Sequence, residues 1–189
     1  MNVRAWIATV AMLMCLVASI SVAAQQSGNS AVHHSTVFAP DNENGGFEKA
    51  MPPSDLILNA LLLNIAKSAD TKSQGEELIR LDREAQRKRF RVVQIDLGDA
   101  KEEDYLALGS EPVTGADNDW FWIVQVTQGK ATVLLFTGGL GVKLLPRKSN
   151  GHFDIRTYWS SAAFEQTELY RYTGSVYKLV SKHTHARQP

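Results

Sequence analysis

A series of short apolar segments between residues 90 and 182 constrains the fold of this chain more than any other feature. The segments that predict strands are 92–97, 105–108, 120–126, 130–136, 142–145, 155–159, 168–172 and 176–180. Turn-forming residues separate them, among them Gly129, the Gly138–Gly141 run and Gly174. Short strands at close spacing with glycine-containing turns predict an antiparallel β-meander of about six to eight strands.

Two helices are predicted ahead of these strands. The first begins after Pro53, because Ser54 is suited to cap a helix and Asp55 favours its positive end. Apolar residues then recur at spacings of three and four, on one face: Leu58, Leu61, Leu62 and Ile65. Gln74–Lys88 predicts the second helix. No helix alternates with the strands, so we expect the α+β class, with two N-terminal helices packed on the meander.

The N-terminus has the pattern of a cleavable signal peptide over residues 1–24. Arg4 supplies a positive charge, an apolar stretch runs from Ala5 to Val22, and Ala23 and Ala24 are small residues of the kind read at a cleavage site. The pattern predicts an exported protein, periplasmic or secreted. The alternatives are an uncleaved membrane anchor and a lipoprotein modified at Cys15.

Cleavage would remove the one cysteine, Cys15, so the mature chain would contain no internal disulfide and would depend on its core for stability. The whole chain has 20 Lys and Arg against 20 Asp and Glu. Such a balance provides no global field toward nucleic acid or an anionic membrane. We therefore expect no nucleic-acid partner and no stable membrane insertion after cleavage. The basic run from Arg87 to Arg91 is predicted to be a solvated helix end, with a polyanion-binding patch as the alternative.

The rest of the chain divides into three parts. Residues 25–50 are polar and poor in apolar side chains, which is typical of a flexible leader. Residues 51–182 contain the predicted helices and strands and form one α+β domain. Residues 183–189 are predicted to be a disordered tail.

Aromatic residues near turns and strand ends are the best candidates for a binding surface. The candidate ligand-binding residues are Trp120, Trp122, Tyr158, Trp159, Tyr172 and Tyr177. Exposed aromatic side chains would suit an envelope protein or a glycan partner. The alternative is that all of them belong to the core.

The inventory of reactive side chains favours a binding protein over an enzyme. His152 is the one histidine within the predicted domain, and no nucleophile motif accompanies it or its neighbours Ser149 and Asp154. The sequence therefore predicts no catalytic residue, no metal ligand and no cofactor. A small envelope hydrolase that uses acidic residues stays open as the alternative function.

Two turns that begin or end in aspartate resemble the calcium-binding loops of FG-GAP-type propeller blades. The first runs from Asp96 to Asp104 and the second from Asn150 to Asp154, about 50 residues later. Both matches are partial. The first loop has Gly98, Ala100 and Lys101 where the pattern has other residues, and Pro146 and Lys148 stand at the earlier ligand positions ahead of the second. The resemblance implies calcium binding, while the alternative is that each aspartate bonds to backbone amides of its own turn.

A wider resemblance covers residues 56–180. The segments 58–62, 90–98, 115–122, 150–155 and 170–177 are similar to those of a group of exported bacterial proteins of unknown function. The resemblance implies export and a single domain, and it implies no activity. Locally, Thr173–Tyr177 resembles the loop that periplasmic C-type lysozyme inhibitors insert into the lysozyme cleft, which makes a lysozyme-inhibitor-like protein a further alternative.

Overall fold

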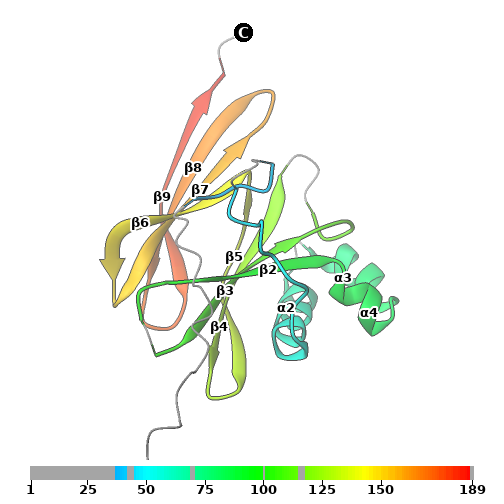
Figure 1. The fold of residues 1–189 in the computed structure, drawn as a ribbon. Helices are drawn as coiled ribbons and strands as arrows, with labels where there is room; N and C mark the ends of the chain where they lie inside the picture. The colour runs from blue at the N-terminus through cyan, green and yellow to red at the C-terminus, as the bar shows by residue number, and fades with distance from the viewer. Residues whose placement is uncertain (1–36, 42–44, 69–70, 100, 115–117, 188–189) are drawn as a thin grey trace, which may run out of the picture. The chain divides into compact units, whose positions relative to one another are not determined.

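A computed structural model describes residues 37–41, 45–68, 71–99, 101–114 and 118–187 (Figure 1). All of them belong to one compact unit, Val32–Pro189. The predicted signal peptide and the first part of the predicted leader lie outside the described residues. No helix in the described part of the chain is long and apolar enough to cross a membrane.

Nine strands in the described residues form two antiparallel sheets. Sheet A has the order β1-β6-β7-β8-β9, and sheet B has the order β2-β3-β4-β5. The bounds are β1 Val37–Phe38, β2 Phe90–Ile95, β3 Glu103–Gly109, β4 Asp119–Thr127, β5 Lys130–Gly139, β6 Gly141–Ser149, β7 His152–Ser160, β8 Phe164–Tyr172 and β9 Tyr177–Ala186. The predicted antiparallel pairing is confirmed, but the single meander is wrong, because the chain leaves one sheet and enters the other between β5 and β6.

The change of sheet takes place at glycine. Gly139 has φ = +140°, a conformation that L side chains rarely adopt, and a Cβ on Gly138 would collide with the ring of Trp159 on β7. The amide of Leu140 donates to the Tyr158 carbonyl. Two adjacent glycines thus let β5 pass close to β7 before the chain turns into β6.

Three helices are described: α2 Asp55–Lys67, α3 Lys72–Ile79 and α4 Arg83–Arg87. The predicted cap is confirmed, since the Ile57 amide donates to Ser54 Oγ at 3.4 Å. The predicted helix over Gln74–Lys88 is wrong, because it is divided into α3 and α4. Asp82 starts a new helix there by accepting from the Ala85 amide at 2.8 Å.

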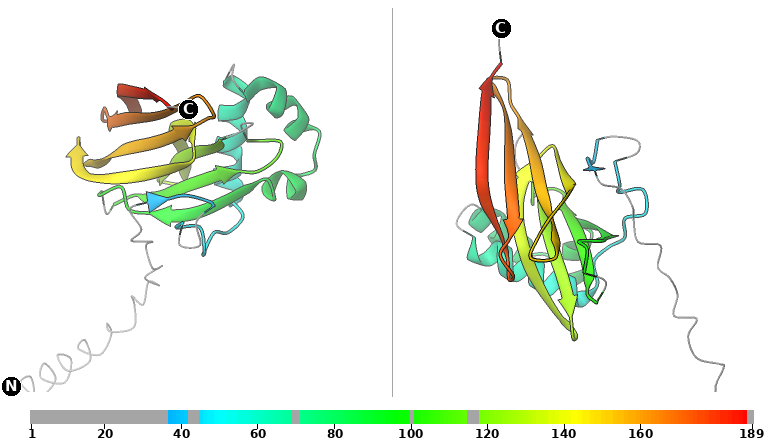
Figure 2. Two further views of the ribbon diagram at one scale, coloured as in Figure 1. Left: turned by 90° about the horizontal axis from the view of Figure 1, so that it is seen from above. Right: turned by 90° about the vertical axis from the view of Figure 1, so that its left-hand side faces the viewer.

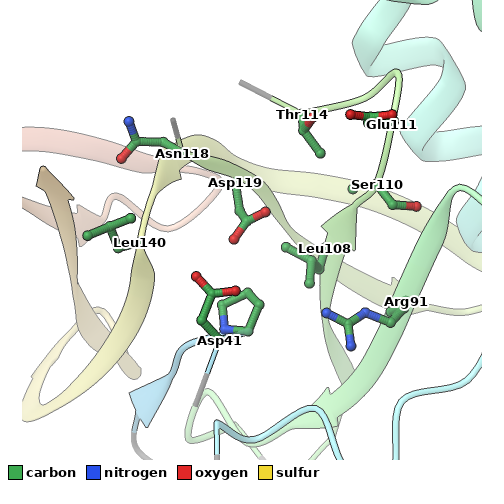
Figure 3. A pocket seen from close by; sticks show the side chains of 11 residues that line it. Asp41, Arg91, Leu108, Ser110, Glu111, Thr114, Asn118, Asp119 and Leu140 are labelled. Carbon is green, nitrogen blue, oxygen red and sulfur yellow. The ribbon is translucent and has the colours of Figure 1, made fainter. Parts of the chain in front are cut away.

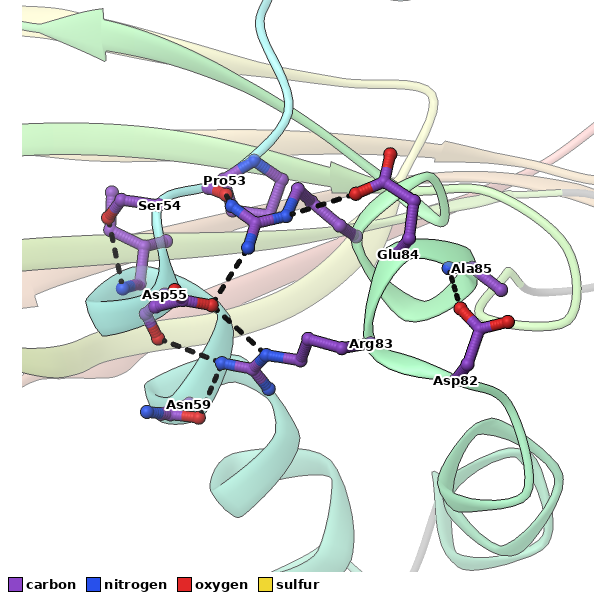
Figure 4. A network of polar contacts seen from close by, with 10 residues as sticks. Pro53, Ser54, Asp55, Asn59, Asp82, Arg83, Glu84 and Ala85 are labelled. Carbon is purple, nitrogen blue, oxygen red and sulfur yellow. Dashed lines mark hydrogen bonds and ion pairs between the residues drawn. The ribbon is translucent and has the colours of Figure 1, made fainter.

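Polar contacts attach α4 to the beginning of α2 (Figure 4). The Asp55 carboxylate accepts from Arg83 Nε at 3.1 Å and from Arg87 Nη2 at 2.8 Å. Arg83 also donates to Asn59 Oδ1, and Arg87 donates to the Pro53 carbonyl. The first arginine of the predicted basic run is therefore used within the fold.

Sheet B contributes to two separate apolar cores through the alternation of its side chains. Its residues Ile95, Leu106 and Ile123 join the core that includes residues of sheet A. Neighbours such as Ala107 and Val124 join the core that includes residues of the helices. In sheet A, β7, β8 and β9 lie side by side over most of their length (Figure 2).

Both ends of the predicted domain extend further than the sequence indicates. Phe38 and Phe47, within the predicted flexible leader, are buried in the core of the two sheets and meet edge to face at 6.1 Å. At the other end, β9 continues through Ala186, so residues 183–186 belong to sheet A instead of a disordered tail.

Candidate functional site

A pocket of about 440 Å³ lies at the end of sheet B where β2 and β4 begin (Figure 3). Its lining combines three carboxylates, one guanidinium, small polar side chains and a few apolar ones. The lining residues are Pro40, Asp41, Arg91, Leu108, Gly109, Ser110, Glu111, Thr114, Asn118, Asp119 and Leu140. The volume is within the range of small-ligand sites in proteins.

The strands of sheet B bring Arg91 and Asp119 to the same end. Arg91 pairs with Leu108, and Leu108 pairs in turn with Phe121, two residues after Asp119. Asp119, the first residue of β4, pairs with Gly139 at the end of β5. Both charged groups are therefore carried on regular strands and not on a loop.

Asp41 reaches the pocket from the N-terminal segment. β1 pairs with β6 through Phe38 and Val142, and the Ala39 amide donates to the Gly45 carbonyl at 2.9 Å. Phe38 is fully buried, which anchors the segment. In Figure 3 the carboxylates of Asp41 and Asp119 point toward each other.

The loop after β3 forms the remaining wall. Arg89 Nη1 donates to the Glu111 carbonyl at 2.8 Å, and the Ser110 amide donates to the Arg89 carbonyl at 2.9 Å. Val113 is fully buried beneath the loop. These contacts hold Ser110 and Thr114 at the pocket.

Burial raises the pKa of Asp119 above its ordinary value, and the nearby Asp41 carboxylate raises it further. The Arg91 guanidinium acts in the opposite direction. Arg91 also lies over the Phe47 ring, 5.5 Å from its centroid. With three carboxylates and one guanidinium in its lining, the pocket favours a positively charged guest.

Asn118 lines the pocket, but in Figure 3 its side-chain amide points away from Asp41 and Asp119. Its Oδ1 is buried and has no hydrogen-bond partner within the described part of the chain. Buried acceptors are normally paired.

The six candidate aromatic residues do not form one exposed surface. Trp122 is fully buried, and Trp120 packs against it with ring centroids 6.4 Å apart. Tyr172 and Tyr177 are buried in the core that joins the two sheets. Tyr158 and Trp159 on β7 are half-buried, and Trp159 lies against Gly138.

The two aspartate turns, distant in sequence, meet in the structure. The Phe153 amide donates to the Leu97 carbonyl at 2.8 Å, and Lys148 Nζ donates to the Gly98 carbonyl at 3.1 Å. The Leu97 amide donates to Asp104 Oδ2 at 3.3 Å, the backbone contact expected of a turn aspartate. A lysine ammonium thus contacts a turn carbonyl between the two loops.

A buried polar bridge crosses the sheets at the same place. Gln125 Nε2 lies 3.1 Å from Asp104 Oδ1, to which it donates, and 3.0 Å from His152 Nε2. Because an amide nitrogen only donates, His152 Nε2 accepts and the ring proton is on Nδ1, which has no hydrogen-bond partner among the described residues. Burial raises the pKa of Asp104 to about 6 and lowers that of His152.

The predicted Ser149, His152 and Asp154 neighbourhood is only partly a cluster. Ser149 Oγ donates to Asp154 Oδ1 at 2.6 Å, whereas His152 stacks on Tyr172 with centroids 4.0 Å apart. Asp154 Oδ2 lies 3.4 Å from Arg171 Nε. In the described residues, no group of three or more His, Cys, Asp or Glu side chains is placed to hold a metal ion.

The local resemblance to lysozyme inhibitors falls on the turn between β8 and β9. Thr173, Gly174 and Ser175 are exposed, and the Thr173 amide donates to the Val176 carbonyl at 2.9 Å. Tyr177 is buried, and its hydroxyl donates to the Phe153 carbonyl.

Sequence reasoning missed the pocket residues Asp41, Arg91 and Asp119. Asp41 lies in a segment that composition predicts to be flexible, and Asp119 follows a polar run typical of a loop. The one available signal was the pair of phenylalanines around Asp41, since Phe38 and Phe47 are unusual in a solvated leader. Compared with protein-family models, curated proteins and solved structures, the chain matches none of them.

Proposed function

We propose that this protein is an exported, non-enzymatic binding module that takes a small cationic ligand in the pocket of Asp41, Arg91 and Asp119. The observation that carries the proposal is the pair of carboxylates that face each other across the pocket (Figure 3). Export is expected from the N-terminal pattern of residues 1–24.

A cation between the two carboxylates would remove an unfavourable interaction. Asp41 raises the pKa of Asp119, so each charge disfavours the other. An ammonium or guanidinium group placed between them pairs with both and donates charge-assisted hydrogen bonds. Arg91 moderates the repulsion from one side without pairing with either carboxylate in a hydrogen bond or ion pair among the described residues.

The rest of the lining describes the other end of the ligand. Ser110 and Thr114 offer hydroxyl groups, and Leu108, Leu140 and Pro40 offer apolar contact. A compact amine with an apolar or hydroxylated body fits this combination, for example an amino sugar, a polyamine or a short basic peptide. The pocket has one pair of facing acids, so we expect one cationic group to dominate the affinity.

The test uses the chain from residue 25 to 189, which contains both cores. A panel of amines and their neutral hydroxyl analogues is screened by thermal shift, and hits are measured by titration calorimetry. We expect amines to bind. Their neutral analogues should bind at least about ten-fold more weakly, because they lack one charge-assisted hydrogen bond.

The double substitution Asp41→Asn with Asp119→Asn keeps the shape of the pocket and removes both charges. Glu76→Gln with Glu77→Gln is the matched control, because it removes two exposed charges on α3. Loss of amine binding in the first variant but not in the second supports the proposal. Equal binding by both variants, or no amine binding by the wild type, refutes it.

A hydrolase that uses acidic residues is the second candidate, and the raised pKa of Asp119 beside Asp41 favours it. A carboxyl with a raised pKa is suited to act as a general acid, and a neighbouring carboxylate can act as the base. Incubation of each bound ligand with the protein, followed by mass spectrometry, separates the two functions. Conversion that is lost in Asp119→Asn identifies an enzyme, whereas an unchanged ligand leaves the binding module.

A further inference from the structure

We propose that the outer face of sheet A binds an anionic polysaccharide through four cations, Lys143, Arg156, Arg171 and Lys178. We call these four residues the basic face. They lie on four consecutive strands, β6 to β9, and none of them lines the pocket.

The register places the four side chains on one face. Lys143 is directly opposite Arg156, and Arg171 is directly opposite Lys178. Arg156 is opposite Leu169, which is two residues from Arg171 and therefore on the same face. The intervening residues Ile155 and Tyr170 are opposite each other, and Ile155 is fully buried in the core.

Like charges directly opposite each other on a sheet destabilise it, and the basic face contains two such pairs. Lys143, Arg156 and Lys178 form no ion pair with any described residue. The Asp154 carboxylate, two residues before Arg156 on β7, is 1% exposed and already shared by Arg147 and Arg171. The basic face therefore has a positive charge that the described ion pairs do not neutralise.

An external anion would neutralise it. The part of the leader ahead of Asp41 is not suited, because residues 25–40 contain no Asp or Glu. A lipid surface is disfavoured because the apolar residues between the cations, Leu145, Tyr158 and Leu169, are half-buried and not exposed for insertion. A single nucleic acid strand is disfavoured as well, because its bases would stack on exposed aromatic rings and Tyr158 on this face is half-buried.

A linear polysaccharide with a carboxylate on each sugar matches a face that has unneutralised cations and no exposed apolar side chains between them. Lys143 and Arg156 are opposite each other on adjacent strands roughly 5 Å apart, and so are Arg171 and Lys178, while the step from Arg156 to Arg171 is a longer diagonal. The cations therefore form two pairs across the sheet, and a polymer with repeated carboxylates can contact both pairs at once. Hydroxyl groups of Thr167 and Ser181 lie on the same face, since Leu169 is opposite Ser181 and is two residues from Thr167. They can bond to sugar hydroxyls between the charged contacts.

The test measures binding of oligogalacturonate to residues 25–189 by titration calorimetry at low and moderate salt. Neutral dextran of similar length, polyglutamate, a single-stranded oligonucleotide and phosphatidylglycerol vesicles are compared. We expect oligogalacturonate to bind most tightly, dextran not to bind, and the affinity to fall as salt screens the charges.

The variant Arg156→Gln with Lys178→Gln removes two cations and spares those that hold Asp154. Its matched control, Lys67→Gln with Lys130→Gln, removes two exposed charges elsewhere. We expect the first variant to bind oligogalacturonate at least about ten-fold more weakly, because the loss of two charge contacts lowers affinity by roughly one order of magnitude. The control should bind less than about two-fold more weakly. The melting temperature should not fall, because like-charge pairs are relieved.

Four results overturn the proposal. They are no binding of oligogalacturonate by the wild type, equal weakening in both variants, and tighter binding of polyglutamate, the oligonucleotide or vesicles than of the polysaccharide. The fourth is salt-sensitive self-association that is lost in Arg156→Gln with Lys178→Gln, measured by sedimentation, which would make a second copy the partner. Amine binding in the pocket is measured in parallel and should not change in either variant.

Discussion

Asp104 and Asp119 are both acids whose pKa is raised by burial, but their surroundings differ. Asp104 is 2% exposed and accepts hydrogen bonds from Gln125 and the Leu97 amide. Asp119 is half-buried in a pocket wall and has a second carboxylate, Asp41, as its electrostatic neighbour.

The difference separates a structural acid from an acid that is available to a ligand. Asp104, Gln125 and His152 complete one another and connect sheet B with sheet A. The Asp119 carboxylate has no hydrogen-bond partner among the described residues, and in the proposed function a cation supplies one. A raised pKa alone does not distinguish the two cases, whereas the inventory of hydrogen-bond partners does.

The largest effect is expected for Gln125→Leu, which removes the shared donor of Asp104 and His152. The substitution leaves the Asp104 carboxyl and His152 Nε2 buried without their shared donor, so we expect the unfolding free energy to fall by about 2–4 kcal/mol. Urea denaturation measures it. Asn118→Leu in the pocket is the matched control and should cost less than about 0.5 kcal/mol through its Oδ1, because that atom has no partner to lose. Similar losses in the two variants would remove the distinction.

The pH dependence of stability is a second test of the role of Asp104. Asp104 holds its proton more tightly in the folded protein, so its contribution to stability is complete below about pH 4 and is lost as the pH rises through about 6. The shift corresponds to up to about 3 kcal/mol. His152 acts oppositely, because its lowered pKa makes stability fall as the pH drops below 6.5.

Urea denaturation between pH 4 and 8, on the wild type and on Asp104→Asn, separates these contributions. We expect the loss between pH 4 and 6 to disappear in the variant, leaving only the loss that His152 causes at low pH. A wild-type profile identical to that of Asp104→Asn would show that Asp104 titrates as an ordinary carboxyl.

A smaller effect of opposite sign is expected for Asp119→Asn. The substitution removes the repulsion between Asp119 and Asp41, so the unfolding free energy should rise by up to about 1 kcal/mol at neutral pH. The rise should shrink as the pH falls and Asp119 becomes protonated, because its raised pKa means that stability is lost as it ionises. A decrease in stability would mean that Asp119 has a structural partner.

The smallest predicted effect concerns Arg91. Arg91→Gln removes the cation that lowers the pKa of Asp119, so that pKa should rise further. Carboxyl NMR titration of Asp119 measures it, and the pKa of Asp104 serves as the internal control because Arg91 does not perturb it. An unchanged Asp119 titration would show that Arg91 does not act on the carboxyl pair.

Much of the fold follows from alternation, but the site does not. Val93 and Ile95 alternate clearly enough to predict β2, and Ser54 identifies the start of α2. Alternation of apolar side chains does not indicate which sheet a strand joins, so it could not predict the change of sheet at Gly138 and Gly139. Local patterns also missed Asp82, whose cap divides the predicted second helix.

The candidate site was missed for a related reason. The pairing of β1 with β6 brings Asp41 close to Asp119. The composition of a short segment cannot predict a pairing between two segments so far apart in the sequence. Among the aromatic residues, alternation placed Trp120 and Trp122 on one face, and the structure adds that this face packs with the helices. Only the three-dimensional arrangement turns these residues into core and the acids into a pocket.

The attachment of β1 to β6 also has a kinetic consequence. Val37 pairs with Lys143, and pairings between segments that are distant along a chain form slowly, after local hairpins such as β4–β5. Asp41 therefore enters the pocket late in folding. We expect a refolding protein to recover its sheet signal before it recovers ligand affinity, so that binding competence reports completion of the fold.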